Sequence, residues 1–142
     1  MNPAYLTEQL ELIRDYIARA RSIQQRPQEE FLNDYILIDA AVRELTVLFE
    51  TAHNVAKHLI AELAWRPARS KAEAFEILAE MGVLPDDLCD AFRQASRFRN
   101  LVTYQTLVID NALVYDILRE RLPDFERFAT SVALWLERRR GG

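Results

Sequence analysis

The sequence has little glycine, cysteine or lysine, and each shortage excludes something. Its 142 residues include only 3 glycines and 5 prolines, too little turn material for an all-β fold. The single cysteine, Cys89, excludes an intrachain disulfide and a cysteine-based zinc site, and we expect it to be a small buried residue. No apolar run approaches the roughly 18 residues of a membrane-spanning helix. The polar N-terminus, Met1-Asn2-Pro3, lacks a signal-peptide core, so we expect a soluble, cytoplasmic protein.

The positive charge comes almost entirely from arginine. Lys57 and Lys71 are the only lysines, and the other 16 basic residues are arginine. The formal net charge of −4 does not by itself favour nucleic-acid binding. Arginine is nevertheless the better bidentate ligand for phosphate. A GC-rich genome or ordinary ion pairing on the surface would explain the same bias.

Half of the residues are hydrophobic, and they recur with helical spacing along almost the whole chain. This pattern predicts helices over residues 4–25, 31–65, 70–82, 85–106 and 110–136. The second would be one uninterrupted helix of about 35 residues, roughly 50 Å long. It is apolar on two faces, which is typical of a helix at the centre of a bundle or shared with a partner chain. Pro123 is expected to kink or split the last helix.

The predicted fold is all-α, an antiparallel up-and-down bundle of four long helices plus one short helix. We expect one domain over residues 1–142, with residues 137–142 as a frayed tail that contains three consecutive arginines. The sequence shows no glycine-rich nucleotide loop, serine nucleophile motif or metal-ligand cluster, so we expect no cofactor and no metal. Composition and periodicity alone do not identify a reaction.

One face of the fourth predicted helix carries the strongest set of candidate functional side chains. Arg93, Arg97, Asn100 and Tyr104 are spaced 4, 3 and 4 residues apart, so they share a face. Cations, an amide and an aromatic ring together suit an RNA backbone with an unstacked base. The alternative is a solvated face whose arginines form ion pairs with acids on a neighbouring helix.

The two histidines do not form a helical metal site. His53 and His58 are five residues apart, whereas a shared face needs three or four. Glu50 and His53 are three apart and are expected to face the same way, in a structural pair rather than a ligand pair.

Several stretches carry a family resemblance. They are residues 74–85, Arg97-Phe98-Arg99-Asn100-Leu101, residues 109–118, and residues 50–59 of the predicted long helix. They resemble the HEPN superfamily, specifically the HepT-like toxins of minimal-nucleotidyltransferase toxin–antitoxin pairs. The resemblance covers most of the chain. It implies a homodimer in which two copies of a motif share one cleft.

The motif of this family is Arg, four residues, His, one residue and Tyr, usually with Asn after the Arg. Arg99 and Asn100 match its first two residues, but Tyr104 stands at the histidine position and Thr106 at the tyrosine position.

An alternative register from Arg97 would place Val102 at the histidine position and Tyr104 at the tyrosine position. We prefer the register from Arg99, because the Arg-Asn pair and the downstream Asp110 then align without a gap. Neither register supplies a histidine.

The resemblance implies an RNA-directed toxin similar to metal-independent endoribonucleases. Arg99 would engage the scissile phosphate, with Asn100 and Tyr104 as the other catalytic candidates and Arg93 and Arg97 as further RNA contacts. A tyrosine with a pKa of about 10 is a poor general base at neutral pH, although it can donate a hydrogen bond or stack on a base. We therefore expect RNA binding to survive and cleavage to be weak or lost, unless Arg99 and Tyr104 support a different mechanism.

The resemblance also implies a partner, a minimal nucleotidyltransferase antitoxin that transfers AMP to the toxin. The acceptor candidates are the hydroxyls of Tyr104 and Thr106. Charge added beside the arginines would mask them from RNA. Two alternatives remain: a non-catalytic binding subunit that partners with or presents substrate to a nucleotidyltransferase, and a structural helical dimer whose arginines only form ion pairs.

Overall fold

The computed structural model describes residues 2–104 and 110–141, with the backbone alone described over residues 101–104. Its helices are α1 (Pro3–Gln24), α2 (Gln28–Leu32), α3 (Tyr35–Glu62), α4 (Lys71–Glu80), α5 (Asp86–Tyr104) and α6 (Asn111–Gly141). These ranges contain no strand, and the predicted all-α class is confirmed. No helix in the described part of the chain has the length and apolar character needed to cross a membrane.

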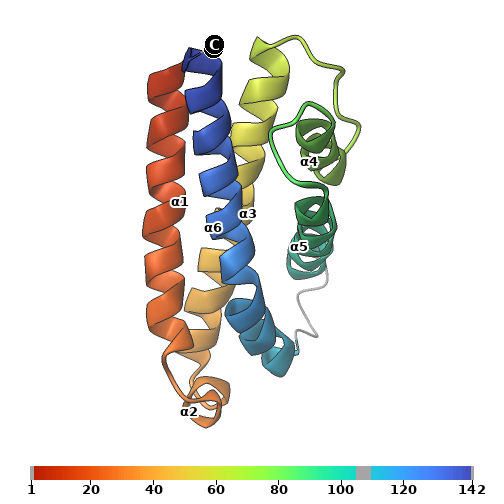
Figure 1. Ribbon diagram of the computed structural model, residues 1–142. Helices are drawn as coiled ribbons and strands as arrows, with labels where there is room; N and C mark the ends of the chain where they lie inside the picture. The colour runs from red at the N-terminus through yellow and green to blue at the C-terminus, as the bar shows by residue number, and fades with distance from the viewer. Residues whose placement is uncertain (1, 105–109, 142) are drawn as a thin grey trace.

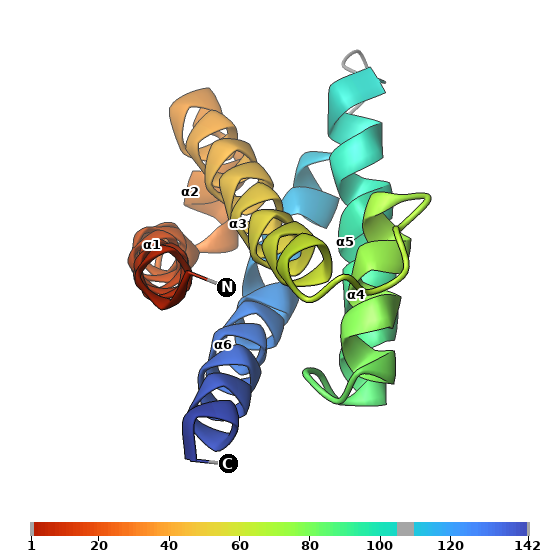
Figure 2. The same cartoon turned by 90° about the horizontal axis from the view of Figure 1, so that it is seen from above.

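Helices α1, α3 and α6 form the long body of the molecule, and α4 and α5 pack beside it (Figure 1). The chain runs down α1 and back up both α3 and α6. Helix α5 is foreshortened in Figure 1 but is seen along its length in Figure 2, so it crosses the body rather than running along it. The prediction that all four long helices lie antiparallel in one bundle is therefore wrong for α5.

The predicted continuous helix over residues 31–65 is in fact two helices, α2 and α3. Asn33 ends α2, and its side-chain amide donates a hydrogen bond of 2.8 Å to the Glu29 carbonyl. The Asp34 side chain then caps α3 by accepting from the backbone N–H groups of Ile36 and Leu37, at 3.0 and 3.4 Å. The Asn33 amide thus donates to a carbonyl near the end of α2, and Asp34 accepts from free N–H groups at the start of α3, so the break has a local cause.

Helix α6 continues through Pro123, so of the kink or split expected there, the split does not occur. A proline inside a helix leaves the carbonyl four residues earlier without its usual N–H donor. Here that carbonyl belongs to Arg119, and the side-chain amide of Gln24 from α1 donates to it at 3.4 Å. The helix runs on to Gly141, so the expected frayed tail is helical from residue 137 to residue 141.

An aromatic cluster attaches the α4–α5 pair to the body. Phe75 of α4 stacks on Phe92 of α5 with ring centroids 4.3 Å apart. Phe49 of α3 and Phe128 of α6 approach the Phe75 ring to 5.7 and 5.9 Å. All four rings are at most 2% exposed. Cys89, in the first turns of α5, is also buried, as predicted, and burial raises the pKa of its thiol.

Two helix ends use the same turn with different residues. After α3, Ala64 adopts a φ of 54°, and the Trp65 N–H reaches back to the Ile60 carbonyl at 3.0 Å. After α4, Gly82 adopts a φ of 81°, and the Val83 N–H donates to the Leu78 carbonyl at 2.8 Å. This is the Schellman end, whose left-handed residue is usually glycine. Ala64 therefore occupies a conformation that costs an L side chain free energy.

Candidate functional site

Glu50 of α3 links three helices by charge. Its carboxylate accepts a hydrogen bond from Arg99 Nε of α5 at 2.7 Å, and from Lys71 Nζ of α4 at 2.8 and 3.0 Å. The exposed fractions of these side chains are 34% for Glu50, 30% for Lys71 and 23% for Arg99. Burial raises the pKa of Glu50, but the hydrogen bonds and positive charges of Lys71 and Arg99 together outweigh it and lower that pKa. An ionised Glu50 thus holds Arg99 against α3.

His53 lies one turn after Glu50 on α3, as their spacing predicts. Its ring is half-buried, 6.3 Å from the ring of Phe75. Burial lowers the pKa of His53, and the charge of Lys71 lowers it further, against the opposite effect of Glu50. The imidazole is therefore predominantly neutral at pH 7.

His58 belongs to a different part of the surface. Its ring packs on Tyr5 with centroids 4.7 Å apart, and its Nε2 accepts the Asn2 backbone N–H at 3.5 Å. Within residues 2–104 and 110–141, no three His, Cys, Asp or Glu side chains gather as a metal site would require. The two histidines thus have separate surroundings.

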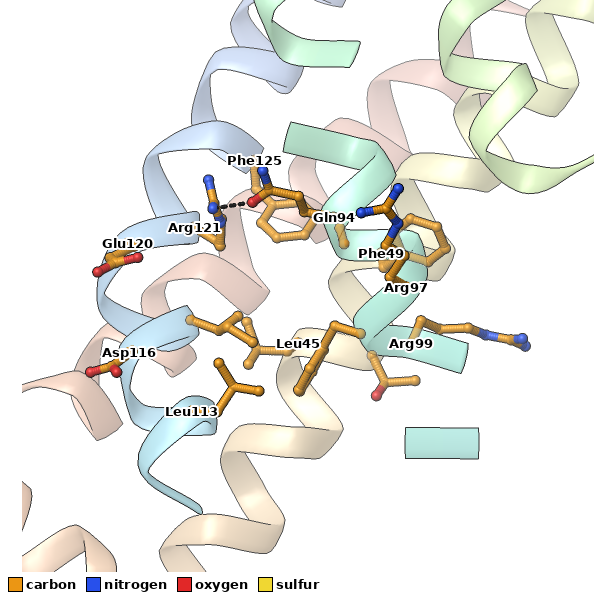
Figure 3. Close-up of a pocket in the computed structure, with 14 residues that line it drawn as sticks. Leu45, Phe49, Gln94, Arg97, Arg99, Leu113, Asp116, Glu120, Arg121 and Phe125 are labelled. Carbon is orange, nitrogen blue, oxygen red and sulfur yellow. Dashed lines mark hydrogen bonds between the residues drawn. The ribbon is translucent and has the colours of Figure 1, made fainter. Parts of the chain in front are cut away.

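A groove of about 520 Å³ opens between α3, α5 and α6 (Figure 3). Arg97 and Arg99 line it from α5, while Asp116 and Glu120 line it from α6. In Figure 3 the Arg99 guanidinium points away from the α6 carboxylates, and the α6 margin carries a cation of its own, Arg121. Between the margins the lining is mainly apolar, formed by Leu45, Phe49, Ala95, Phe98, Leu113, Ile117 and Phe125.

Arg93 and Arg97, the two arginines predicted to contact RNA beside Arg99, have different surroundings. Arg93 is engaged by acids: its Nε donates to Glu76 of α4 at 2.9 Å, and it also pairs with Asp90. This is the ion-pairing alternative that the sequence left open. Arg97 is exposed and forms no ion pair with the residues that the structure describes. The guanidinium of Arg97 is therefore more available to a ligand than that of Arg93.

The remaining motif residues are only partly described. Asn100 is exposed, next to Arg99 on α5. Tyr104 is the last residue of α5, and its side chain lies outside the described part of the chain. Thr106 also lies outside the described residues. The structure thus brings Arg97 and Arg99 to one groove margin, while the roles of Tyr104 and Thr106 stay predictions.

Sequence reasoning missed the contacts of Glu50 with Lys71 and Arg99. These residues are 21 and 49 positions away from Glu50, and neither pair shares a helix. No periodicity reports such a contact, because it depends on how α4 and α5 pack on α3.

Comparison with known proteins identifies the family. The family model described as Ribonuclease HepT-like matches residues 9–132. The chain belongs to this family. The resemblance to HepT-like proteins seen in the sequence is therefore confirmed. No curated protein sequence matches this HepT-like chain significantly.

Solved structures share the fold of this HepT-like protein. A tri-AMPylated Shewanella oneidensis HEPN toxin in complex with MNT antitoxin is 20% identical, with a TM-score of 0.85 over 94% of this chain and 99% of that one. A toxin–antitoxin structure with AMP-PNP is 20% identical, with a TM-score of 0.83 over 94% and 98% of the two chains. YutE from Bacillus subtilis, a cytosolic protein of unknown function, is 18% identical, with a TM-score of 0.87 over 100% and 95%.

Within the HepT-like fold, the Arg-Asn pair stands near the end of α5. Tyr104, which the preferred register of the sequence places at the family's histidine position, is the last residue of that helix. That assignment remains a prediction from the sequence.

Proposed function

We propose that this HepT-like protein is the toxin of a toxin–antitoxin pair whose antitoxin is a minimal nucleotidyltransferase, and that its target is RNA. The family match supports the toxin role, and two structural neighbours are toxins seen with antitoxins. The observation that carries the RNA assignment is Arg99, fixed by Glu50 at a groove margin with the exposed Arg97 on the same margin.

The chemistry of this margin suits a phosphodiester. Arginine binds phosphate oxygens through paired N–H donors, so Arg97 and Arg99 can engage one strand at adjacent phosphates. Asn100 adds an amide for a 2′-hydroxyl or a base edge. Tyr104 donates a hydrogen bond or stacks on a base, and it replaces the histidine that would move a proton. We therefore expect RNA binding with slow, metal-independent cleavage.

The groove also supports a homodimer. Its apolar lining includes Leu113, which is 41% exposed in the single chain. A second copy packed over α5 and α6 would cover this surface and bring two Arg99 margins together. Such a dimer is cytoplasmic in our proposal, as its RNA target requires.

Cleavage of a labelled RNA by the purified protein in EDTA tests the nuclease. The Arg99→Ala variant should lose cleavage, and the matched Arg14→Ala variant, altered on an exposed position of α1, should retain it. Wild-type protein that leaves RNA intact over a wide concentration range, yet binds it, would contradict the nuclease and leave a non-catalytic binding subunit.

The missing histidine gives a gain-of-function test. Tyr104→His restores a side chain with a pKa near 6.5 at the family's histidine position, so cleavage should rise by about 10²-fold or more. The readout is the initial rate of RNA cleavage beside growth inhibition on expression. An unchanged rate would show that residue 104 does not take part in proton transfer.

The partner is tested by AMP transfer. Incubation with the nucleotidyltransferase and labelled ATP should label the wild-type chain. Tyr104→Phe and Thr106→Val each remove one candidate hydroxyl, so loss of label in one variant identifies the acceptor. Label retained in the double variant would place the modification elsewhere.

A further inference from the structure

Both lysines of the chain line one pocket outside the groove. The pocket has a volume of about 480 Å³ and lies where α3 ends and the chain crosses to α4 (Figure 1). Lys57 and His53 line it from α3, Arg69 from the connecting loop and Lys71 from the start of α4. No carboxylate is among the described residues that line it, in a chain whose net charge is −4. The pocket is therefore a local concentration of positive charge.

The cations of this pocket are only partly neutralised by neighbours. Lys57 is exposed and forms no ion pair with the residues that the structure describes. Arg69 is 89% exposed, and its Nε is 3.9 Å from Glu73, a carboxylate already 2.9 Å from Arg66. Lys57 and Arg69 thus have free hydrogen-bonding capacity for an anion.

The pocket also presents an aromatic ring. Trp65 lines it and is half-buried, with its ring edge-on to Trp135 at a centroid distance of 6.0 Å. A partly exposed indole beside cations is the combination on which nucleic-acid bases stack next to bound phosphates. The N-terminus of α4 opens at the same place, and its dipole adds partial positive charge.

Lys71 links this pocket to Arg99 through a shared partner, Glu50. Its ammonium binds the same Glu50 carboxylate that binds Arg99, and its side chain lines the pocket. Lys71 is thus the cation of the pocket that lies next to Arg99, with Lys57 and Arg69 lining the same pocket.

We infer that the pocket of Lys57, Arg69, Lys71 and Trp65 is a second phosphate-and-base subsite for the RNA strand bound at Arg99. This inference rests on the proposed function, because it extends the same strand beyond the groove. The subsite binds the backbone through Lys57 and Arg69 and one unstacked base through Trp65.

The test is binding of a fluorescently labelled single-stranded RNA of about 12 nucleotides, followed by anisotropy at several salt concentrations. The full-length Lys57→Gln/Arg69→Gln variant should bind about 3- to 10-fold more weakly at low salt, with a salt slope reduced by about 1.4 for two lost phosphate contacts. The matched Arg14→Gln/Arg19→Gln variant changes the charge equally on α1 and should match the wild type.

A second readout places the strand at the indole. In a Trp135→Phe background Trp65 is the remaining tryptophan, and RNA binding should quench its fluorescence. A folded Lys57→Gln/Arg69→Gln variant with wild-type affinity and slope, or Trp65 emission unchanged by bound RNA, would overturn the subsite.

The outcomes separate this inference from the proposed function. If Arg99→Gln weakens RNA binding and Lys57→Gln/Arg69→Gln does not, the subsite fails and the RNA target stands. If the wild type binds no RNA at low salt, the RNA target itself fails. Binding of ATP that depends on Lys57 and Arg69, without RNA binding, would make the pocket a mononucleotide site and overturn the strand subsite.

Discussion

Replacing Glu50 by glutamine isolates the charge that Arg99 and Lys71 share. The amide keeps the shape of the side chain and one acceptor oxygen, so the helices need not repack. The substitution removes the negative charge of the carboxylate, which accepts hydrogen bonds from Arg99 Nε at 2.7 Å and from Lys71 Nζ at 2.8 and 3.0 Å. The side chains of these groups are between 23% and 34% exposed, so each ion pair contributes about as much as a surface pair does. We expect Glu50→Gln to lower the free energy of unfolding by about 1 kcal/mol at pH 7.

The pH dependence of this loss has a definite sign. The pKa of Glu50 is lower in the folded protein than its ordinary value of 4.5. The stabilisation is therefore fully present above that value and disappears as the pH falls through the folded pKa. The gap in unfolding free energy between wild type and Glu50→Gln should be constant from about pH 7 to 5 and then narrow as the pH falls below 4.5 and through the folded pKa.

Urea denaturation across this pH range is the assay, with Glu8→Gln on an exposed position of α1 as the matched control. The same loss of negative charge beside Arg99 should tighten RNA binding by about 2- to 5-fold at low salt, and the gain should fade as salt screens it. A variant as stable as wild type at pH 7, or a gap that does not narrow as the pH falls below 4.5, would refute an ionised Glu50 at the centre of the site.

Three other substitutions test the fold and the assembly. Ala64→Gly should raise the free energy of unfolding by about 0.5–1 kcal/mol, because glycine adopts the φ of 54° without strain; an unchanged or lower value would contradict this. Gly82→Ala should lower the free energy of unfolding by about 1 kcal/mol, because the φ of 81° is unfavourable for alanine although an added Cβ would meet nothing within 4 Å. Urea denaturation measures the effects of both the Ala64 and the Gly82 substitutions. Leu113→Asp should shift the wild-type dimer to monomer in light scattering, and a dimer that survives would move the interface away from the groove.

Much of the helical structure could be predicted from local sequence. Ser70 caps α4 by accepting from the Glu73 N–H at 3.1 Å, and Asp110 caps α6 by accepting from the Ala112 N–H at 3.0 Å; both residues begin helix ranges that the sequence predicts. These are contacts within a few residues, where side-chain chemistry alone decides the geometry.

The predictions failed where a capping pair or a contact with another helix decided the structure and the apolar spacing did not reveal it. Apolar spacing continues from Phe31 through Tyr35, so periodicity hid the break that the Asn33-Asp34 pair imposes. The partner of the Arg119 carbonyl is Gln24, on another helix, and no pattern around Pro123 reveals it. The crossing of α5 was equally hidden, because amphipathic spacing defines a buried face and leaves the direction of the helix open.

For the site, the sequence revealed several of the residues involved but not which of them contact one another. Arg99 and Asn100 stood out because the family motif is local. The sequence singled out Glu50 for its spacing to His53 and as part of residues 50–59, and Lys71 only as one of two lysines, with no contact predicted between them. Their contact forms only when α4 and α5 have packed on α3, so the electrostatic setting of Arg99 is a tertiary property.

The scarcity of lysine makes the protein its own footprinting probe. Apart from the N-terminal amine, the primary amines of the whole chain are those of Lys57 and Lys71, and both line the same pocket. Acetylation with a limiting reagent, read by mass spectrometry, would therefore report occupancy of that pocket with almost no background from the rest of the surface. Lys57, exposed and without an ion pair among the described residues, should react first, and Lys71, hydrogen-bonded to Glu50, should follow.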